Sequence, residues 1–309
     1  MTASFFRKGR RFPGTALESG GVAALLAFLI WGCLPLYWKT LDRMPPLEIL
    51  CHRVFWSFWT MLPVILCTGR LGHIMVILGS RARLLPLAAS SLVLSGNWLL
   101  FIWAVNSGRV LETSLGYFIN PLLNILLGMI LFRERLRPAA WVAVALAAAG
   151  VGSQIISLGH LPWTALSLGG SFALYGLIRK MAPVEALPGL FMETLLILPA
   201  ALAWLLWEGS KGTGVTFAAD PSFLLLLAAS GPLTALPLFL FAFGVRRLRM
   251  TSLGLLQYVS PTMTFFQGVF LFGEPFSLSS LLTFSCIWAA LALYSWDSLG
   301  KGRTAAQRT

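Results

Sequence analysis

The sequence predicts an all-α membrane protein with ten transmembrane helices, and two observations carry this prediction. Hydrophobic residues make up 57% of the 309 residues and charged residues only 11%, which leaves too little polar surface to cover a water-soluble domain. The apolar residues also occur in runs of about 20, the length at which an α-helix spans a hydrocarbon core of about 30 Å. Strands of a membrane β-barrel would instead alternate apolar and polar residues over about ten positions.

The ten expected spans form two groups of five. They cover residues 19–38, 49–68, 84–104, 113–132 and 138–157, and then 163–180, 187–207, 222–244, 251–272 and 277–296. The segments between them are short, and the sequence contains no GxxxxGK[ST] motif, so we expect no nucleotide-binding domain of the kind that drives an ATP-dependent pump. A separate ATPase subunit remains an alternative.

The distribution of Lys and Arg predicts the orientation of these spans. Eighteen of the 23 basic residues lie on one side of the ten-span arrangement, and four lie on the other. Because cytoplasmic segments retain positive charge, we expect both termini in the cytoplasm, with basic tails over residues 1–18 and 298–309. A single miscounted span would destroy this alternation, so the charge bias also favours the count of ten.

The cysteines and the net charge indicate neither a metal site nor a nucleic-acid partner. Cys33, Cys51, Cys67 and Cys286 lie in apolar stretches and form no CxxC pair, which is typical of small buried hydrophobic residues. The net charge of +12 comes from short clusters between apolar runs rather than from one basic face. We therefore expect no bound cofactor, and the expected partners are the lipid bilayer and a small-molecule substrate.

An internal repeat relates the two groups of spans. Residues 113–116 and 251–254 both read Thr-Ser-Leu-Gly, and four further residues of the fourth span recur 140 positions later in the ninth. These are Pro121, Gly128, Phe132 and Glu134, which match Pro261, Gly268, Phe272 and Glu274. The chain thus reads as two five-span domains, 19–158 and 162–297. Because five is odd, their topologies are inverted, as in secondary transporters that work by alternating access.

The two matching prolines point to a binding site. Pro121 and Pro261 each remove a backbone donor inside an apolar segment, and paired interruptions of this kind mark the substrate site of inverted-repeat transporters. Three nearby polar residues, Tyr117, Asn120 and Tyr258, are candidates to bind a solute. The alternative is that the prolines aid helix packing and the polar groups bridge helices, which is the favoured interpretation for Asn124 and Gln267.

Two ionisable residues lie well inside spans and form a second candidate site. Arg53 and Glu193 are also 140 residues apart, and a charge at mid-bilayer costs about 2.5–3.5 kcal/mol. We hypothesise that they pair or jointly line the pathway; the alternative is a salt bridge with a purely structural role. His52, beside Arg53, and Glu193 are candidates for proton coupling, although a membrane histidine also serves as a hydrogen-bonding strut.

Several segments together resemble a known family over residues 19–297. They are Trp31 to Lys39, Pro46 to Leu50 followed by His52-Arg53, Ser114 to Pro121 (Ser-Leu-Gly-Tyr-Phe-Ile-Asn-Pro), Tyr175 to Lys180, and Gln257-Tyr258 with Pro261. The chain resembles the RarD branch of the EamA family, in the drug/metabolite transporter superfamily. The resemblance implies a multi-pass permease of the bacterial inner membrane that moves a small organic solute, a drug or an amino-acid-like metabolite. It adds Tyr175 to the candidate substrate-binding residues.

Further candidates and rival functions remain at this point. Asn97 and Trp98 in the third span are candidates to contact a solute, with core packing as the alternative for Trp98. Ala-rich stretches at 143–152 and 289–292 suit close helix contact or a homodimer. A channel-like facilitator is the main rival function. An intramembrane enzyme is less favoured, because the sequence has no HExxH, GxSG or paired-carboxylate motif, and no catalytic residue is expected.

Overall fold

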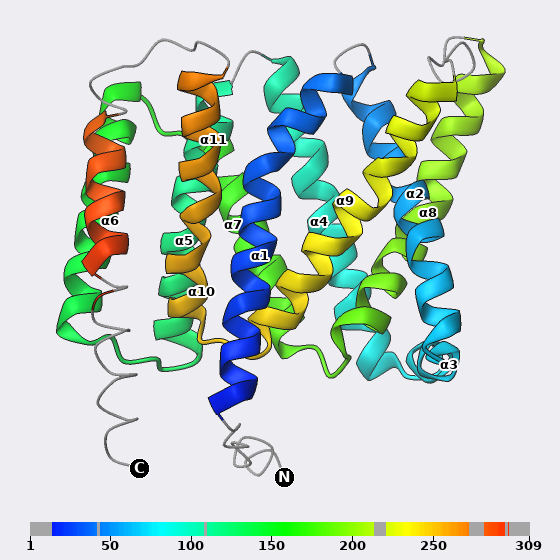
Figure 1. The fold of residues 1–309 in the computed structure, drawn as a ribbon, viewed down its shortest axis with the longest axis horizontal. Coiled ribbons are helices and arrows are strands. Elements are labelled where there is room, and N and C mark those ends of the chain that lie inside the picture. Colours follow the sequence, from blue (N-terminus) through cyan, green and yellow to red (C-terminus); the bar gives the residue numbers. More distant parts are fainter. Residues whose placement is uncertain are drawn as a thin grey trace.

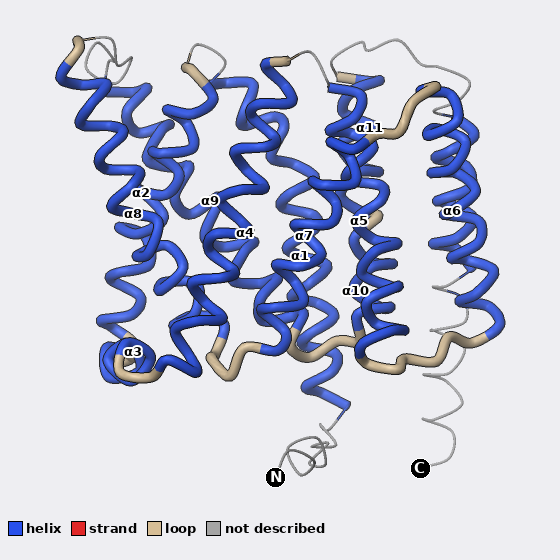
Figure 2. Tube along the Cα trace, turned by 180° about the vertical axis from the view of Figure 1, so that it is seen from behind, coloured by secondary structure: helices blue, strands red, loops and turns tan. Residues whose placement is uncertain are grey.

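The computed structural model describes residues 14–41, 44–107, 110–212, 221–271, 281–293 and 296. Within these ranges the chain forms helices joined by short loops and contains no strand (Figure 2). The helices are α1 (Gly14–Trp38), η1 (Lys39–Leu41), α2 (Pro46–Cys67), α3 (Leu71–Leu78), α4 (Arg81–Asn106), α5 (Val110–Leu131), α6 (Pro138–Leu158), α7 (Trp163–Met181), α8 (Ala186–Ser210), α9 (Pro221–Val245), α10 (Met250–Gln257) and α11 (Val259–Phe270). A last helix covers Leu281–Leu293.

Six of the described helices are long and apolar enough to cross a membrane. They cover Gly20–Leu41, Pro46–Cys67, Arg81–Phe101, Pro138–Ile156, Ala186–Ser210 and Pro221–Val245. Two shorter helical stretches, Leu115–Leu131 and Leu281–Leu293, are also apolar. The prediction of an all-helical, multi-pass membrane protein is therefore confirmed for the described residues. Each of the ten expected ranges overlaps a helix, or the α10–α11 pair, of the structure.

The helices stand side by side, and their order defines two ends of the bundle (Figure 1). We call the end at which α1 begins and α3 lies the lower end, and the end at which α1 leads into α2 the upper end. The start of α8 also lies at the lower end, because Glu185 just before it forms an ion pair with Arg70 just before α3. Consequently α2 and α8 enter the bundle from opposite ends.

Two apolar cores hold the bundle together. The larger joins α1, α2, α3, α4, α7, α8, α9 and α10, and the second joins α5, α6, α10 and the last helix with parts of α7 and α11. Glycines permit close approach where α5 crosses α7: a Cβ at Gly116 would lie 3.1 Å from the Ala165 carbonyl oxygen, and one at Gly169 would lie 3.1 Å from the Gly116 carbonyl oxygen. Such small residues let membrane helices pack backbone to backbone.

The Ala-rich stretch of α6 packs inside this chain. Ala143 and Ala147 are fully buried in the second core, and the Thr283 hydroxyl of the last helix donates a 3.0 Å hydrogen bond to the Gly150 carbonyl. A Cβ at Gly150 would lie 3.0 Å from the Thr283 carbonyl oxygen. These contacts account for the small residues of α6 through close helix contact within one chain.

The offset of 140 residues also appears in the helix boundaries. The helices α2 and α8 begin at residues 46 and 186, α4 and α9 at 81 and 221, and α5 and α10 at 110 and 250. Arg53 and Glu193 are consequently each the eighth residue of their helix. The matched residues of the sequence thus coincide with matched positions on helices.

The two prolines affect their helices differently. The ninth expected span is divided at Tyr258, between α10 and α11 and three residues before Pro261, whereas α5 continues through Pro121. The expected interruption of the fourth span is therefore not observed. Helix α10 packs closely against this point, since a Cβ at Gly254 would lie 2.5 Å from the Pro121 carbonyl oxygen. Neighbouring helices can support a proline within a membrane helix in this way.

Candidate functional site

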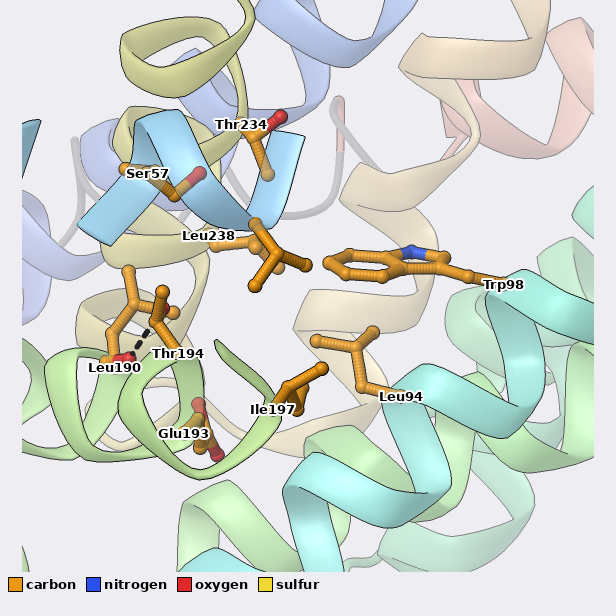
Figure 3. A pocket seen from close by; sticks show the side chains of 11 residues that line it. Ser57, Leu94, Trp98, Leu190, Glu193, Thr194, Ile197, Thr234 and Leu238 are labelled. Atoms are coloured by element: carbon orange, nitrogen blue, oxygen red, sulfur yellow. Dashed lines mark hydrogen bonds between the residues drawn. The ribbon is translucent and has the colours of Figure 1, made fainter. Parts of the chain in front are cut away.

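A cavity lies inside the bundle between α2, α4, α8 and α9 (Figure 3). Its unfilled space is about 340 Å³, part of it open to solvent. The wall is mostly apolar and includes five polar or aromatic side chains: Ser57, Trp98, Glu193, Thr194 and Thr234. Figure 3 shows Thr234 and Glu193 on opposite sides of this space. A largely apolar cavity with a few polar groups is the usual character of a small-molecule site.

Arg53 lies toward the upper end of the bundle and is held by residues of three other helices. Its guanidinium carbon lies 4.6 Å from the ring centroid of Trp38 and 4.8 Å from that of Trp98. Its Nε donates a 3.1 Å hydrogen bond to the Thr234 hydroxyl. We call Arg53, Trp38, Trp98 and Thr234 the Arg53 cradle. Because Trp98 and Thr234 line the cavity, the cradle forms one border of that space.

Two tyrosines lie within electrostatic range of the Arg53 cradle. Both Tyr37 and Tyr117 interact electrostatically with the guanidinium. The Tyr37 hydroxyl donates a 2.7 Å hydrogen bond to the Leu226 carbonyl, whereas Tyr117 is 55% exposed. Arg53 itself is partly exposed, and no carboxylate of a described residue lies within ion-pair distance of it. The cradle is therefore accessible and lacks an acidic partner among the described residues.

Glu193 lies toward the lower end and is enclosed by hydrogen-bond donors. Its Oε1 lies 3.5 Å from Arg179 Nε, and its Oε2 accepts a 3.4 Å hydrogen bond from the Tyr175 hydroxyl. The Ser90 hydroxyl donates to the same carboxylate. We call these four residues the Glu193 cluster. Arg179 is 0% exposed and Glu193 is 1% exposed, so this ion pair is shielded from water.

The packing around Arg179 closes the lower end further. Its Nη2 donates a 3.1 Å hydrogen bond to the Ala186 carbonyl, and a Cβ at Gly189 would lie 2.8 Å from that same nitrogen. The absence of a side chain at Gly189 therefore leaves the room that the guanidinium occupies. The ring of Tyr175 stacks on Phe241 with centroids 6.0 Å apart, and Phe172 packs against both rings. Apolar and ionic contacts together seal this part of the bundle.

The hypothesis that Arg53 and Glu193 pair directly is not supported by their positions. Because α2 and α8 enter the bundle from opposite ends, the eighth residue of each helix lies toward a different end. The carboxylate of Glu193 is bonded instead to Arg179, a residue that the sequence analysis counted among the basic residues of a loop. The second form of the hypothesis, a shared pathway, agrees with the geometry: Glu193 lines the cavity and Arg53 contacts two lining residues.

Three other candidates bridge helices. Asn97 donates hydrogen bonds of 2.9 Å to the Leu168 carbonyl and 2.8 Å to the Ser171 hydroxyl of α7. Asn120 donates a 2.7 Å hydrogen bond to the Gly169 carbonyl, also in α7. The Tyr258 hydroxyl donates a 3.2 Å hydrogen bond to the Phe118 carbonyl of α5. These contacts favour the structural alternative for all three residues.

The remaining candidates divide between the two regions. His52 is buried at 7% exposure and interacts electrostatically with Glu48, one turn earlier on α2. Tyr175 belongs to the Glu193 cluster and Trp98 to the Arg53 cradle. Among the residues that the structure describes, no group of three or more His, Cys, Asp or Glu side chains is placed to hold a metal ion.

Charged contacts also tie the loops together at the lower end. Lys180 donates to the Val245 and Leu248 carbonyls after α9. Glu134 accepts hydrogen bonds of 2.9 Å and 3.0 Å from the backbone nitrogens of Met250 and Thr251. Burial lowers the pKa of Arg246, which follows α9, and the positive charge of Arg179 lowers this pKa further. These contacts join loops from both groups of helices.

Comparison with known proteins then identifies the family. The model of the EamA-like transporter family matches residues 18–153, which cover α1 to most of α6. Protein RarD of Escherichia coli is 42% identical over 91% of this chain and 95% of its own length. The chain belongs to the RarD branch of the EamA family. An uncharacterized transporter of Pseudomonas aeruginosa is 47% identical, and the transporter YojE of Bacillus subtilis is 43% identical, each over 91% of this chain and 95% of the relative.

A solved structure supports the fold. A protein of known crystal structure matches with a TM-score of 0.67 and 17% identity, over 90% of this chain and 97% of the other. At this identity the likeness concerns the fold alone. Membership of the EamA family makes this protein a membrane transporter of the drug/metabolite type, which agrees with the function expected from the sequence.

Proposed function

We propose that this EamA protein is a secondary transporter that moves a small organic solute across the bacterial inner membrane by alternating access. In this proposal ten helices form two five-helix repeats of inverted topology, over residues 19–158 and 162–297, with the lower end facing the cytoplasm. The offset of 140 residues between matched helix starts supports the repeat. The excess of Lys and Arg on one side supports the orientation.

The observation that carries this proposal is the different state of two matched positions. At the eighth residue of α8, Glu193 is 1% exposed and paired with Arg179. At the eighth residue of α2, Arg53 is partly exposed and no described acid lies within ion-pair distance. Alternating access requires one end of the pathway to be closed while the other is open. The arrangement fits a state that is closed at the lower end.

Opening the lower end would separate the Glu193 cluster. The four residues of this cluster come from α4, α7 and α8, so a movement of α7 against α4 and α8 would break the ion pair or carry it along. Leaving a buried charge without its partner costs about 3–5 kcal/mol. We therefore propose that opening is coupled to a change that offsets this cost, such as solute binding or protonation of Glu193.

Solute flux in proteoliposomes tests the function. The purified protein would be reconstituted, and uptake of labelled amino acids and chloramphenicol measured with and without an imposed pH gradient. We expect saturable uptake, accelerated when unlabelled solute is present inside the vesicles, because only a carrier exchanges solutes in this way. Glu193→Gln should abolish this exchange, whereas Glu185→Gln, which removes a carboxylate of the exposed Arg70 pair, should leave it unchanged.

Two results would contradict this proposal. Flux that rises linearly with solute concentration and shows no exchange would indicate a channel-like facilitator. Full exchange activity in the Glu193→Gln variant would show that the Glu193 cluster does not control access. Flux that responds to the pH gradient in the wild type but not in His52→Gln would assign proton coupling to the other candidate.

A further inference from the structure

The guanidinium of Arg53 has unused hydrogen-bonding capacity. This group carries five N–H donors in one plane, and one of them, on Nε, is bonded to Thr234. No described group accepts a hydrogen bond from Nη1 or Nη2 of Arg53. Trp38 and Trp98 lie against the guanidinium at 4.6 Å and 4.8 Å, measured to the ring centroids. The aromatic contacts hold the group in place and leave the two Nη nitrogens as donors.

The positive charge of Arg53 also lacks a described acidic partner. An unpaired charge within a membrane segment costs about 2.5–3.5 kcal/mol, and such residues normally face a partner or a solute pathway. Glu193, which lines the same cavity, is already paired with Arg179. Glu48 lies one turn earlier on α2, where it interacts electrostatically with Cys51 and His52. Cation–π contacts reduce the cost of the charge but supply no negative group.

The cavity beside the cradle has an apolar wall. Leu94, Ile197 and Leu238 line it together with Trp98 and Thr234 of the cradle (Figure 3). A ligand that places a negative group on Arg53 would therefore lay its remaining atoms against aliphatic and aromatic side chains. Burial of an apolar body contributes about 25 cal/mol per Å², so this wall favours an amphipathic anion over a small hydrated one.

We propose that the Arg53 cradle binds the carboxylate of the transported solute, and that the solute is an organic carboxylate with a compact apolar body. The proposal rests on the transporter function proposed above. The two Nη groups of Arg53 form the paired hydrogen bonds that planar guanidinium and carboxylate groups make with each other. Trp38, Trp98 and Thr234 fix the orientation of the guanidinium. The apolar wall of the cavity holds the rest of the solute.

A matched set of ligands tests the charge and shape of the site. Thermal unfolding of the full-length protein in detergent would be followed with 3-phenylpropanoate, its neutral amide 3-phenylpropanamide, and the cation 3-phenylpropylamine. We expect the carboxylate to raise the unfolding midpoint in a saturable manner, and the amide and amine to leave it unchanged. Equal stabilisation by the amide or the amine, or no stabilisation by the carboxylate, would overturn the proposal.

Three variants assign the effect to the cradle. Arg53→Gln should remove the response to 3-phenylpropanoate. Arg53→Lys keeps the charge but loses the planar pair of donors, so the concentration for half-maximal response should rise about tenfold or more. Arg81→Gln is the matched control, because it removes an exposed arginine at the lower end. An unchanged response in both Arg53 variants would overturn the proposal. If Arg53→Gln does not fold, Arg53→Lys still decides.

Other oxyanions share this chemistry and need separate arms. Inorganic phosphate and nanodiscs that contain phosphatidylglycerol would be tested against the wild type and Arg53→Lys. If either one stabilises the protein through Arg53 and 3-phenylpropanoate does not compete, the cradle binds inorganic phosphate or a lipid headgroup and the solute proposal fails.

The same measurements separate this inference from the transporter function. Saturable exchange of neutral or cationic solutes that is unaffected by Arg53→Gln would retain the transporter and reject the carboxylate site. Arg53-dependent binding of 3-phenylpropanoate without any saturable flux would retain the site and reject the transporter.

Discussion

The Arg53 cradle and the Glu193 cluster occupy matched positions on α2 and α8, yet they accommodate a charge within the bundle by different means. Glu193 has a cationic partner and two hydroxyl donors, all within the protein. Arg53 has two aromatic faces and one hydroxyl acceptor, and it remains partly exposed. A charge that is fully matched internally stabilises one arrangement of helices. A charge that is only partly matched keeps capacity for a ligand.

The largest effect is expected from breaking the Glu193 cluster. Arg179→Met should lower the free energy of unfolding by about 3–5 kcal/mol, because it leaves the Glu193 carboxylate buried without its cation. Titration with SDS in mixed micelles measures this change. The double variant Arg179→Met with Glu193→Leu should recover most of the loss, since both charges are then removed. Equal losses in the single and double variants would show that the pair itself is not responsible.

A smaller loss is expected from crowding Arg179. Gly189→Ala places a Cβ 2.8 Å from Nη2 of the guanidinium, so the guanidinium or α8 must shift, at a cost of about 1–3 kcal/mol. The same unfolding titration detects it. Gly170→Ala in α7 is the matched control: no atom outside its own helix lies within 4 Å of that Cβ, and replacing a helical glycine stabilises by about 0.5–1 kcal/mol. Similar losses in both variants would contradict this packing.

Removing one face of the Arg53 cradle should have a moderate effect. Trp98→Leu keeps an apolar side chain but loses the cation–π contact, which contributes about 0.5–2 kcal/mol. We expect the response to 3-phenylpropanoate to weaken by about 2- to 30-fold, because the guanidinium is less well oriented. Thermal unfolding with ligand measures this change. Trp141→Leu, at an exposed position on α6, should leave the response unchanged.

The smallest effect is expected at the exposed ion pair of the lower end. Arg70 and Glu185 have side chains that are 35% and 59% exposed. Because solvent screens exposed pairs, Glu185→Gln should cost at most about 1 kcal/mol, and this cost should diminish at high salt. Unfolding titrations at two ionic strengths measure both quantities. A loss as large as that of Arg179→Met would mean that burial is not what distinguishes the two pairs.

Most of the fold could be predicted from the sequence, because run length and charge alternation are strong signals in membrane proteins. Each expected span overlaps a helix, and the offset of 140 residues reappears in the helix starts. The same offset also contained information that the pairing hypothesis did not use. Inverted repeats place matched residues toward opposite ends of the bundle, which argues against a direct contact between Arg53 and Glu193.

The partners of the charged residues were harder to predict. Arg179 precedes Lys180 near the end of a span and therefore resembles a residue of a basic loop. Its burial depends on the turn into α8 and on the space that Gly189 leaves. The amide of Asn120 bonds a backbone carbonyl of another helix, and every residue supplies such a carbonyl. Sequence patterns identify polar residues within spans but do not identify acceptors of this kind.

The 181 residues that separate Arg53 from Thr234 also affect biosynthesis. When Arg53 leaves the ribosome, Trp38 has already been made, while Trp98 and Thr234 have not. Glu193, in contrast, follows Ser90, Tyr175 and Arg179 in the chain, so all of its partners precede it. During synthesis the acid thus meets a complete set of partners, whereas the arginine must wait for α9 before its last contact can form.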